Sequence, residues 1–337
     1  MPRPILRVAF VFLTPAAPLA AEIHTVAPAV FHHTFAARHP VLARIKPGDT
    51  VRTKTLDAGG QDERGLRRAE PSNPLTGPFF IEGAEPGDAL LVRLDRIRIN
   101  RNWGWSGFRL LLSALLPEYV EGIYSADYKQ DLIRKGRANL VPWDIDLAAG
   151  LVRLREPAAR RLKLEYAARP MLGCIGVAPA GDFAPTSAPS GPYGGNLDYN
   201  RIVEGITVML PVYHPGGLLF LGDGHALQAD GEPLGTGVEV SMDVEFTVSL
   251  RKRAGLSGPR LESQEFLISI GSQPEFASSL DRALQMATTD MVRWLAAEYG
   301  LEPWAAHLLV GCQGRYEVVT VAGSMALLVP KRLLPQP

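Results

Sequence analysis

The chain has 337 residues, long enough to bury a sizeable core and longer than most single domains. Lysine and arginine together number 35, as do aspartate and glutamate, so the charge balance favours neither a nucleic-acid partner nor an anionic membrane surface. The 33 glycines, the 28 prolines and the scarcity of long helical patterns before Pro274 indicate many turns and a mostly β structure.

Residues 1–21 have the layout of a secretory signal peptide. Two arginines precede an apolar run at residues 8–13, and small residues follow at 16–21. The run is too short to cross a bilayer, and no later segment is apolar for long enough, so we expect no membrane partner. We therefore predict a periplasmic or secreted protein, or a cytoplasmic one if residues 1–21 are retained. An apolar N-terminal strand is the alternative, which Pro15 and Pro18 disfavour.

Short strands separated by turns follow in the first half of the chain. Residues 50–56 alternate as a half-buried strand does, and Asp57 stands at its end before two glycines. An aspartate in that place commonly starts a turn. Residues 79–82 form another strand, ending at Glu82, and residues 89–94 form the next. Because Glu82 ends an apolar strand, we expect it to be partly buried and make it the leading candidate for a general base.

Polar side chains gather around glycines in residues 191–239. Asn196 and Asp198 lie in GGNLD, Asp223 and His225 lie two apart in GDGH, and Glu239 begins an alternating strand over residues 239–250. We expect the apolar runs 206–211 and 218–221 to be paired strands that bring these turns to one end of a sheet. Carboxylates, a carboxamide and an imidazole meeting there would suit a divalent metal and an activated water. Plain hairpin turns are the alternative.

The common covalent nucleophiles lack a supporting signature. The chain has no GxSxG, no Ser-x-x-Lys and no cysteine beside a histidine. Cys174 and Cys312 are expected to be core residues, and whether they pair is left open. Towards the C-terminus, residues 276–299 and 303–310 predict two helices, followed by a strand pair at 318–329.

Seven motifs in a fixed order resemble the acetamidase/formamidase family of amide hydrolases over residues 23–331. They are HHTF, GDTVRTKTLDAGGQ, PLTGPFFIEGAEPGDALLVRL, GCIGVAP, GGNLD, GDGHALQADGE and GTGVE. The resemblance places His33 and Asp57 at the site and favours Glu239 as a ligand. One departure is Ala229, where the family has glycine; if that position needs a positive φ, the turn that follows would shift.

Together these observations predict a mostly β (α+β) fold with β-sandwich or barrel-like sheets and a C-terminal helical hairpin. Residues 22–337 would form the catalytic region, and a division into two lobes, 22–170 and 171–337, is left open. The resemblance implies hydrolysis of a small linear amide to a carboxylate and ammonia by metal-activated water, in a homo-oligomer. Zinc is the first candidate for the metal, and calcium or magnesium is possible. The predicted metal ligands are Asp57, Asp198, Asp223, His225 and Glu239, and the predicted catalytic residues are Glu82, His33 and Asn196.

The alternatives are a catalytically inactive exported binding protein of the same fold and a related hydrolase of lactams or larger amides.

Overall fold

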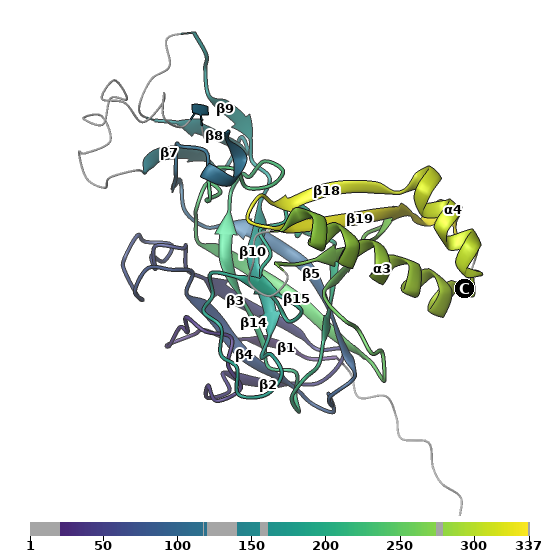
Figure 1. The fold of residues 1–337 in the computed structure, drawn as a ribbon. Coiled ribbons are helices and arrows are strands. Elements are labelled where there is room, and N and C mark those ends of the chain that lie inside the picture. The colour runs from purple at the N-terminus through teal and green to yellow at the C-terminus, as the bar shows by residue number, and fades with distance from the viewer. Residues whose placement is uncertain (1–20, 117, 120–139, 156–160, 274–278, 336–337) are drawn as a thin grey trace, which may run out of the picture.

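The computed structural model describes residues 21–116, 118–119, 140–155, 161–273 and 279–335 (Figure 1). Residues 1–20 of the expected signal peptide lie outside this range. Two large sheets face each other across one apolar core, in which Phe79 and Phe246 meet edge to face with ring centroids 5.2 Å apart. The prediction of a mostly β sandwich-like protein with a C-terminal helix pair is confirmed.

The larger sheet has nine strands among the described residues. In spatial order they are β1 (Ile23–Thr25), β3 (Thr50–Thr55), β15 (Met242–Arg251), β5 (Ala89–Ile99), β13 (Thr207–Pro211), β16 (Arg260–Glu262), β17 (Phe266–Gly271), β19 (Ser324–Pro330) and β18 (Arg315–Thr320). Apolar and polar residues alternate along β15, and its Val244, Phe246 and Val248 are buried, as the sequence pattern predicts.

The opposing sheet has six strands among the described residues. In spatial order they are β11 (Ser190–Gly191), β12 (Gly194–Asn196), β10 (Met171–Val177), β14 (Leu219–His225), β4 (Leu75–Ile81) and β2 (Ala43–Ile45). Every residue of β10 and β14 is buried, because these central strands are covered on both faces. Strands from either side of residue 170 share both large sheets.

A small third sheet adjoins the sandwich. It has the order β6 (Trp103–Ser106), β7 (Val141–Asp146), β8 (Leu151–Leu154) and β9 (Glu165–Ala167). The described residues also form two 3-10 turns, η1 (Leu112–Ala114) and η3 (Lys331–Leu333). The third sheet stands at one end of the sandwich in Figure 1, and Trp105 of β6 bridges to Glu239 just before β15.

Two helices cover part of the nine-stranded sheet. The helix α3 (Leu280–Tyr299) begins at Ser279, whose side chain accepts a hydrogen bond from Arg282 N, and ends at Gly300 with φ 63°. The shorter α4 (Pro303–Gln313) follows. The buried face of α3 packs on β17 and β19 around Trp294. Among the described residues, no helix combines the length and hydrophobicity that crossing a membrane requires.

Candidate active site

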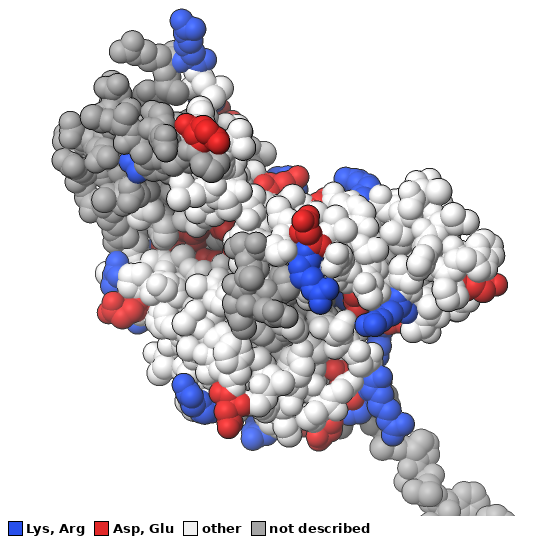
Figure 2. Space-filling view, in the orientation of Figure 1, with Lys and Arg blue, Asp and Glu red and all other residues white. Residues whose placement is uncertain are grey.

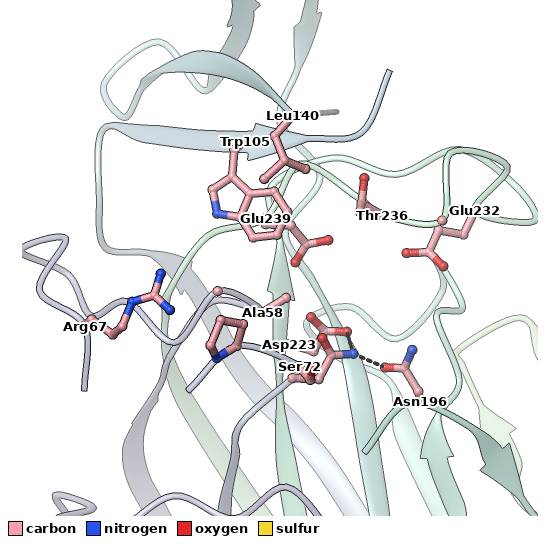
Figure 3. Close-up of a pocket in the computed structure, with 14 residues that line it drawn as sticks. Ala58, Arg67, Ser72, Trp105, Leu140, Asn196, Asp223, Glu232, Thr236 and Glu239 are labelled. Atoms are coloured by element: carbon pink, nitrogen blue, oxygen red, sulfur yellow. Dashed lines mark hydrogen bonds between the residues drawn. The ribbon is translucent and has the colours of Figure 1, made fainter. Parts of the chain in front are cut away.

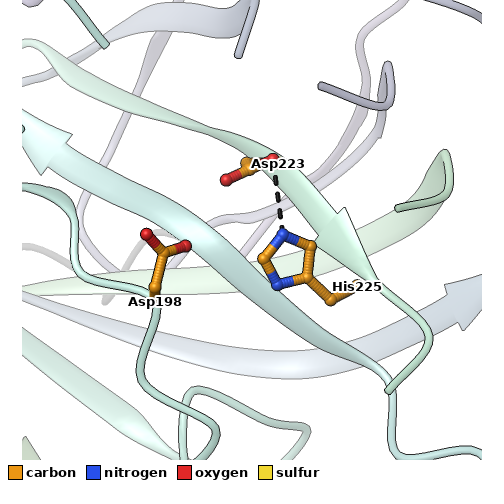
Figure 4. Close-up of side chains that lie close together, drawn as sticks. All are labelled: Asp198, Asp223 and His225. Carbon is orange, nitrogen blue, oxygen red and sulfur yellow. Dashed lines mark ion pairs between the residues drawn. The ribbon is translucent and has the colours of Figure 1, made fainter. Parts of the chain in front are cut away.

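The sequence GDGH lies within β14 and does not form a turn. The two apolar runs expected to pair are instead β13 and β14, which belong to opposite sheets. Asp223 has φ 57°, a conformation unusual within a strand, and its Oδ1 lies 3.5 Å from Nε2 of His225. Asp198 follows β12 and also has a positive φ, 47°. Ligand atoms of these three buried side chains lie within 4.8 Å of one another (Figure 4).

Two further carboxyl groups approach His225 from the following segment. Ligand atoms of His225, Glu232 and Glu239 also lie within 4.8 Å of one another. The Nε2 atom of His225 is 3.1 Å from Oε1 of Glu239. The sequence reasoning did not assign Glu232 to the site, although its DGE motif was visible. Glu232 has φ 45°, an unusual backbone conformation for a glutamate, but the sequence alone does not reveal that angle.

Two glycines make room for this cluster. A Cβ at Gly173 of β10 would lie 2.5 Å from Oδ1 of Asp198 and 2.6 Å from Oδ2 of Asp223. A Cβ at Gly237 would lie 2.4 Å from Cγ of His225. A side chain at either position would collide with the cluster, so only glycine fits there. Ala229, in contrast, is not among the described residues with positive φ, so alanine there imposes no strain on the turn.

Gln228 fixes the tautomer of His225. Its Nε2 donates to the carbonyl oxygen of Asp198 at 2.6 Å, so its Oε1 must face Nδ1 of His225, 2.7 Å away. Nδ1 therefore carries a proton that it donates to Gln228. The other ring nitrogen, Nε2, is directed at the carboxylates, where it presents either a second proton or a lone pair.

Four buried ligand atoms in the cluster have no hydrogen-bond partner among the described residues. They are Oδ1 of Asp198, Oδ1 of Asp223, Oε2 of Glu239 and Nε2 of His225, whose 3.1 Å contact with Oε1 of Glu239 is an ion pair without hydrogen-bond geometry. Unpaired buried polar atoms are costly, so four that converge fit a cation between them.

Burial and mutual repulsion also shift the pKa values of the cluster. Burial and the nearby Asp223 raise the pKa of Asp198 to about 7. Burial, reinforced by Asp223, raises the pKa of Glu239 to about 8. Burial and Asp198 raise the pKa of Glu232 well above its usual range. Burial alone would lower the pKa of His225, but Glu239 and Asp223 outweigh it and raise that pKa. Without a cation, the protein thus favours the protonated forms of these groups, as expected where negative charge lacks compensation.

Asn196 orients the carboxylates from β12. Its Nδ2 donates to Oδ2 of Asp198, and its Oδ1 accepts from Nδ2 of Asn73 at 3.1 Å. Asn73 also donates to Oδ2 of Asp223 at 3.1 Å. Cys174 completes this network, with Sγ 2.7 Å from Oδ1 of Asn196. Asn73 was not anticipated from the sequence.

Cys174 and Cys312 are both free thiols, and their surroundings differ. Cys174 is buried, whereas Cys312 is exposed on α4, which is contrary to its expected place in the core. Burial and the nearby Asp223 and Asp198 raise the pKa of the Cys174 thiol well above its usual value. A thiol held protonated in this way is a poor nucleophile, which agrees with the lack of a covalent-nucleophile motif.

The cluster opens into a cavity of about 420 Å³ (Figure 3). Its lining residues come from the loop after β3, from β6, from β12, from β14 and from the segment before β15. They are Ala58, Gly59, Arg67, Pro71, Ser72, Asn73, Trp105, Leu140, Asn196, Asp223, Glu232, Gly235, Thr236 and Glu239. An open cavity beside buried, perturbed carboxyl groups is the arrangement expected of a small-molecule site.

Asp57 does not join the cluster as a metal ligand. Its Oδ2 accepts hydrogen bonds from Nη2 of Arg101 at 2.7 Å and Nε1 of Trp105 at 3.1 Å, and its Oδ1 accepts from the backbone of Gln61. Both oxygens of this fully buried carboxylate are thus occupied by protein donors. An arginine already compensates its charge, and Asp57 is in neither group of side chains whose ligand atoms converge among the described residues.

Glu82 and His33 also lie outside the cavity lining. Glu82 is exposed, contrary to expectation. It follows one end of β4, and Leu75 lies at the other end. Leu75 pairs with Gly222, the neighbour of Asp223. That strand length separates Glu82 from the cluster. His33 contributes its Nε2 to a 2.8 Å hydrogen bond with the carbonyl of Glu70, so it contacts the chain just before the cavity wall.

Comparison with known proteins agrees with this architecture. A 2.75 Å crystal structure of an acetamidase from Yersinia enterocolitica superposes with a TM-score of 0.76 and 28% identity, covering 96% of each chain. A formamidase from Methylophilus methylotrophus is 27% identical over 253 residues, 63% of this chain and 62% of its own. An acetamidase from Mycolicibacterium smegmatis is 27% identical over 239 residues, 57% of this chain and 59% of its own.

The chain spans less than two thirds of the length of the curated relatives that it matches. The acetamidase/formamidase family model matches residues 24–188 and 177–331, which include the strands and loops of the site. The chain belongs to the acetamidase/formamidase family.

Proposed function

We propose that this protein hydrolyses the C–N bond of a small linear amide to a carboxylate and ammonia, with the help of a divalent cation. The observation that carries the proposal is the convergence of four buried, unpartnered ligand atoms at the base of an open cavity. Family membership supports the amide as substrate, since relatives are named formamidase and acetamidase.

Asp198, Asp223, His225 and Glu239 would hold the cation. One imidazole with several carboxylates is a mixed nitrogen–oxygen donor set, for which zinc is our first candidate. The excess of oxygen donors keeps calcium and magnesium as alternatives. When bound, a divalent ion polarises the amide carbonyl and lowers the pKa of water, which makes hydrolysis feasible near neutral pH. The hydrogen bond from His225 Nδ1 to Gln228 keeps Nε2 directed at the cation position.

Glu232 takes the place that Glu82 was predicted to fill. Its side chain lines the cavity and lies beside His225 and Glu239. We propose that its carboxylate accepts a proton from the attacking water and returns it to the amide nitrogen as the C–N bond breaks, releasing ammonia. A cation held beside it would favour the ionised form that accepts this proton, and the burial that raises its pKa favours keeping the proton between the two steps.

The first test is elemental analysis of protein purified without chelators, together with ammonia release from formamide and acetamide. We expect about one or more equivalents of a divalent metal and measurable release. Metal without release from any small amide would favour a binding protein of the same fold, and release only from lactams or larger amides would redirect the substrate assignment.

The variant His225→Ala should lose both bound metal and activity while its circular dichroism spectrum stays unchanged. His214→Ala is a matched control, because His214 precedes the opposite end of β14 and bonds to the carbonyl of Pro179. Glu82→Gln should also retain activity, since that side chain is exposed and outside the cavity. Full activity in His225→Ala would remove the proposed cation site.

A further inference from the structure

Trp105 forms a wall of the cavity directly beside a cluster residue. Its backbone N–H donates to the carbonyl oxygen of Glu239 at 3.3 Å, and its own carbonyl accepts from Glu239 N at 2.7 Å. The indole lines the cavity and lies next to Glu239 and Leu140 in Figure 3. A flat apolar surface therefore borders the space in which the reacting amide would sit.

A buried ion pair fixes the orientation of this indole. Asp57 accepts from Nε1 of Trp105 through the same oxygen that accepts from Arg101. Arg101 is itself held, since its Nε donates to the carbonyl of Trp103 at 3.0 Å and its guanidinium lies 3.8 Å from the centroid of the Trp103 ring.

Gly59 closes the other side of the indole. A Cβ there would lie 3.3 Å from Cζ2 of Trp105, so the glycine lets the loop pack on the ring. Rotation of the indole away from the cavity would break its hydrogen bond to a buried carboxylate, which is costly. The ring is therefore a fixed wall, and the buried carboxylate of Asp57 is its hydrogen-bond partner.

We propose that Trp105 determines which amides fit the site, and that Asp57 is a positioning residue that acts through the Trp105 indole. The inference rests on the proposed amide hydrolysis and deepens it by naming the residue that would limit the length of the acyl group. An acyl chain long enough to extend from the cluster to this wall would meet a ring that cannot turn aside, so the selection would act on the length of the acyl substituent.

Two substitutions at Trp105 separate the wall from its hydrogen bond. Trp105→Ala removes the ring, and Trp105→Phe keeps a flat ring but removes the N–H donor, while both leave the Asp57–Arg101 pair in place. Trp304→Ala is the matched control, because Trp304 is 66% exposed on α4 and does not line the cavity. For each variant, kcat and KM would be measured with acetamide and butanamide, alongside metal content.

We expect Trp105→Ala to raise the ratio of kcat/KM for butanamide to that for acetamide by about tenfold or more, the scale on which pockets discriminate single methylene groups. Most of the change should lie in KM. Trp105→Phe should give a smaller rise in the same direction, and Trp304→Ala should leave the ratio unchanged. Metal content should stay at the level of the unaltered protein throughout.

If the parent protein is active and Trp105→Ala keeps the parent ratio of the two kcat/KM values, this inference is overturned while the proposed function stands. A merely structural role for Trp105 would lower kcat/KM for both amides equally, and that result would also overturn it. If the parent protein releases ammonia from no amide, the proposed function fails and this inference fails with it.

Discussion

Gly173 sets how closely two carboxylates of the site approach each other. Asp198 follows β12 and Asp223 lies in β14, and both carboxylates lie over the Cα of Gly173, where even one methyl group would lie within 2.6 Å of both of them. Such a distance is far inside van der Waals contact, and both residues are buried. The position therefore controls cluster geometry without contributing a ligand atom.

We expect Gly173→Ala to weaken metal binding by about 10- to 100-fold, the range found when groups that orient metal ligands are removed. Titration of the metal-free variant by calorimetry would measure the change. Gly311→Ala is the control, because a Cβ at Gly311 meets nothing within 4 Å. Unchanged affinity in Gly173→Ala would show that Asp198 and Asp223 do not act together on one cation.

Single residues of the site differ in how far sequence could assign them. Asp57 and Glu239 both lie beside strands in glycine-containing motifs, yet one binds Arg101 and the other faces the cluster. The deciding partner of Asp57 lies 44 residues further along the chain, beyond the reach of local patterns. Glu232 was missed for the complementary reason, since its burial depends on how its turn packs after folding.

Individual strands follow from local alternation, but their assignment to sheets does not. The burial pattern of β15 and the two C-terminal helices could be predicted, because periodicity records which face meets the core. The separation of β13 and β14 into opposite sheets depends on pairing partners such as β5 and β10, which lie far away in sequence. Long-range pairing is specified by the whole set of strands and not by any one of them.

The strand β18 supports both loops that carry cluster residues. Glu317 of β18 accepts a hydrogen bond from the hydroxyl of Tyr199, which is adjacent to Asp198, at 2.7 Å. It also accepts two bonds of 2.6 Å from the guanidinium of Arg201. Val321, just after β18, donates its N–H to the carbonyl of Gly231 beside Glu232 at 2.8 Å. The C-terminal hairpin thus positions the site from outside it.

We expect Glu317→Gln to lower the free energy of unfolding by about 1.5–3 kcal/mol, the contribution of hydrogen bonds to a charged group. Metal affinity should fall with it, because the loop holding Asp198 loses its support. Urea denaturation and metal titration would measure the two effects. Glu63→Gln is the control, since its ion pair with Lys54 is largely exposed and should contribute at most about 1 kcal/mol. Equal effects in the two variants would contradict a special role for β18.

Over the whole molecule, surface charge is mixed, whereas four buried carboxyl groups gather in one cluster. Figure 2 shows acidic and basic side chains interspersed on one face, consistent with equal numbers of each in the chain. In contrast, Asp198, Asp223, Glu232 and Glu239 are gathered in the interior beside one imidazole. Ionising this cluster lowers the free energy of unfolding of the whole protein, because unfolding separates the charges.

This arrangement predicts how stability depends on pH and metal together. In the metal-free folded protein the pKa is about 7 for Asp198 and about 8 for Glu239, and that of His225 is also raised. In the unfolded chain the pKa is about 4 for carboxyl groups and about 6.5 for histidine. Between these limits the folded state binds more protons than the unfolded state, so the free energy of unfolding must fall as pH rises. A bound cation favours the ionised carboxylates and removes that penalty.

We therefore expect the melting temperature of chelator-treated protein to decline from pH 5 to 8 more steeply than that of metal-loaded protein, so that the gap between them widens with pH. At the upper end, a cation at about a hundred times its Kd should add about 2.7 kcal/mol. Differential scanning fluorimetry at constant ionic strength would measure both curves. The double variant Asp198→Asn, Glu239→Gln should flatten the metal-free curve, because neutral amides replace the groups that titrate. Parallel curves for loaded and chelator-treated protein would mean that no cation compensates the buried charge of this cluster.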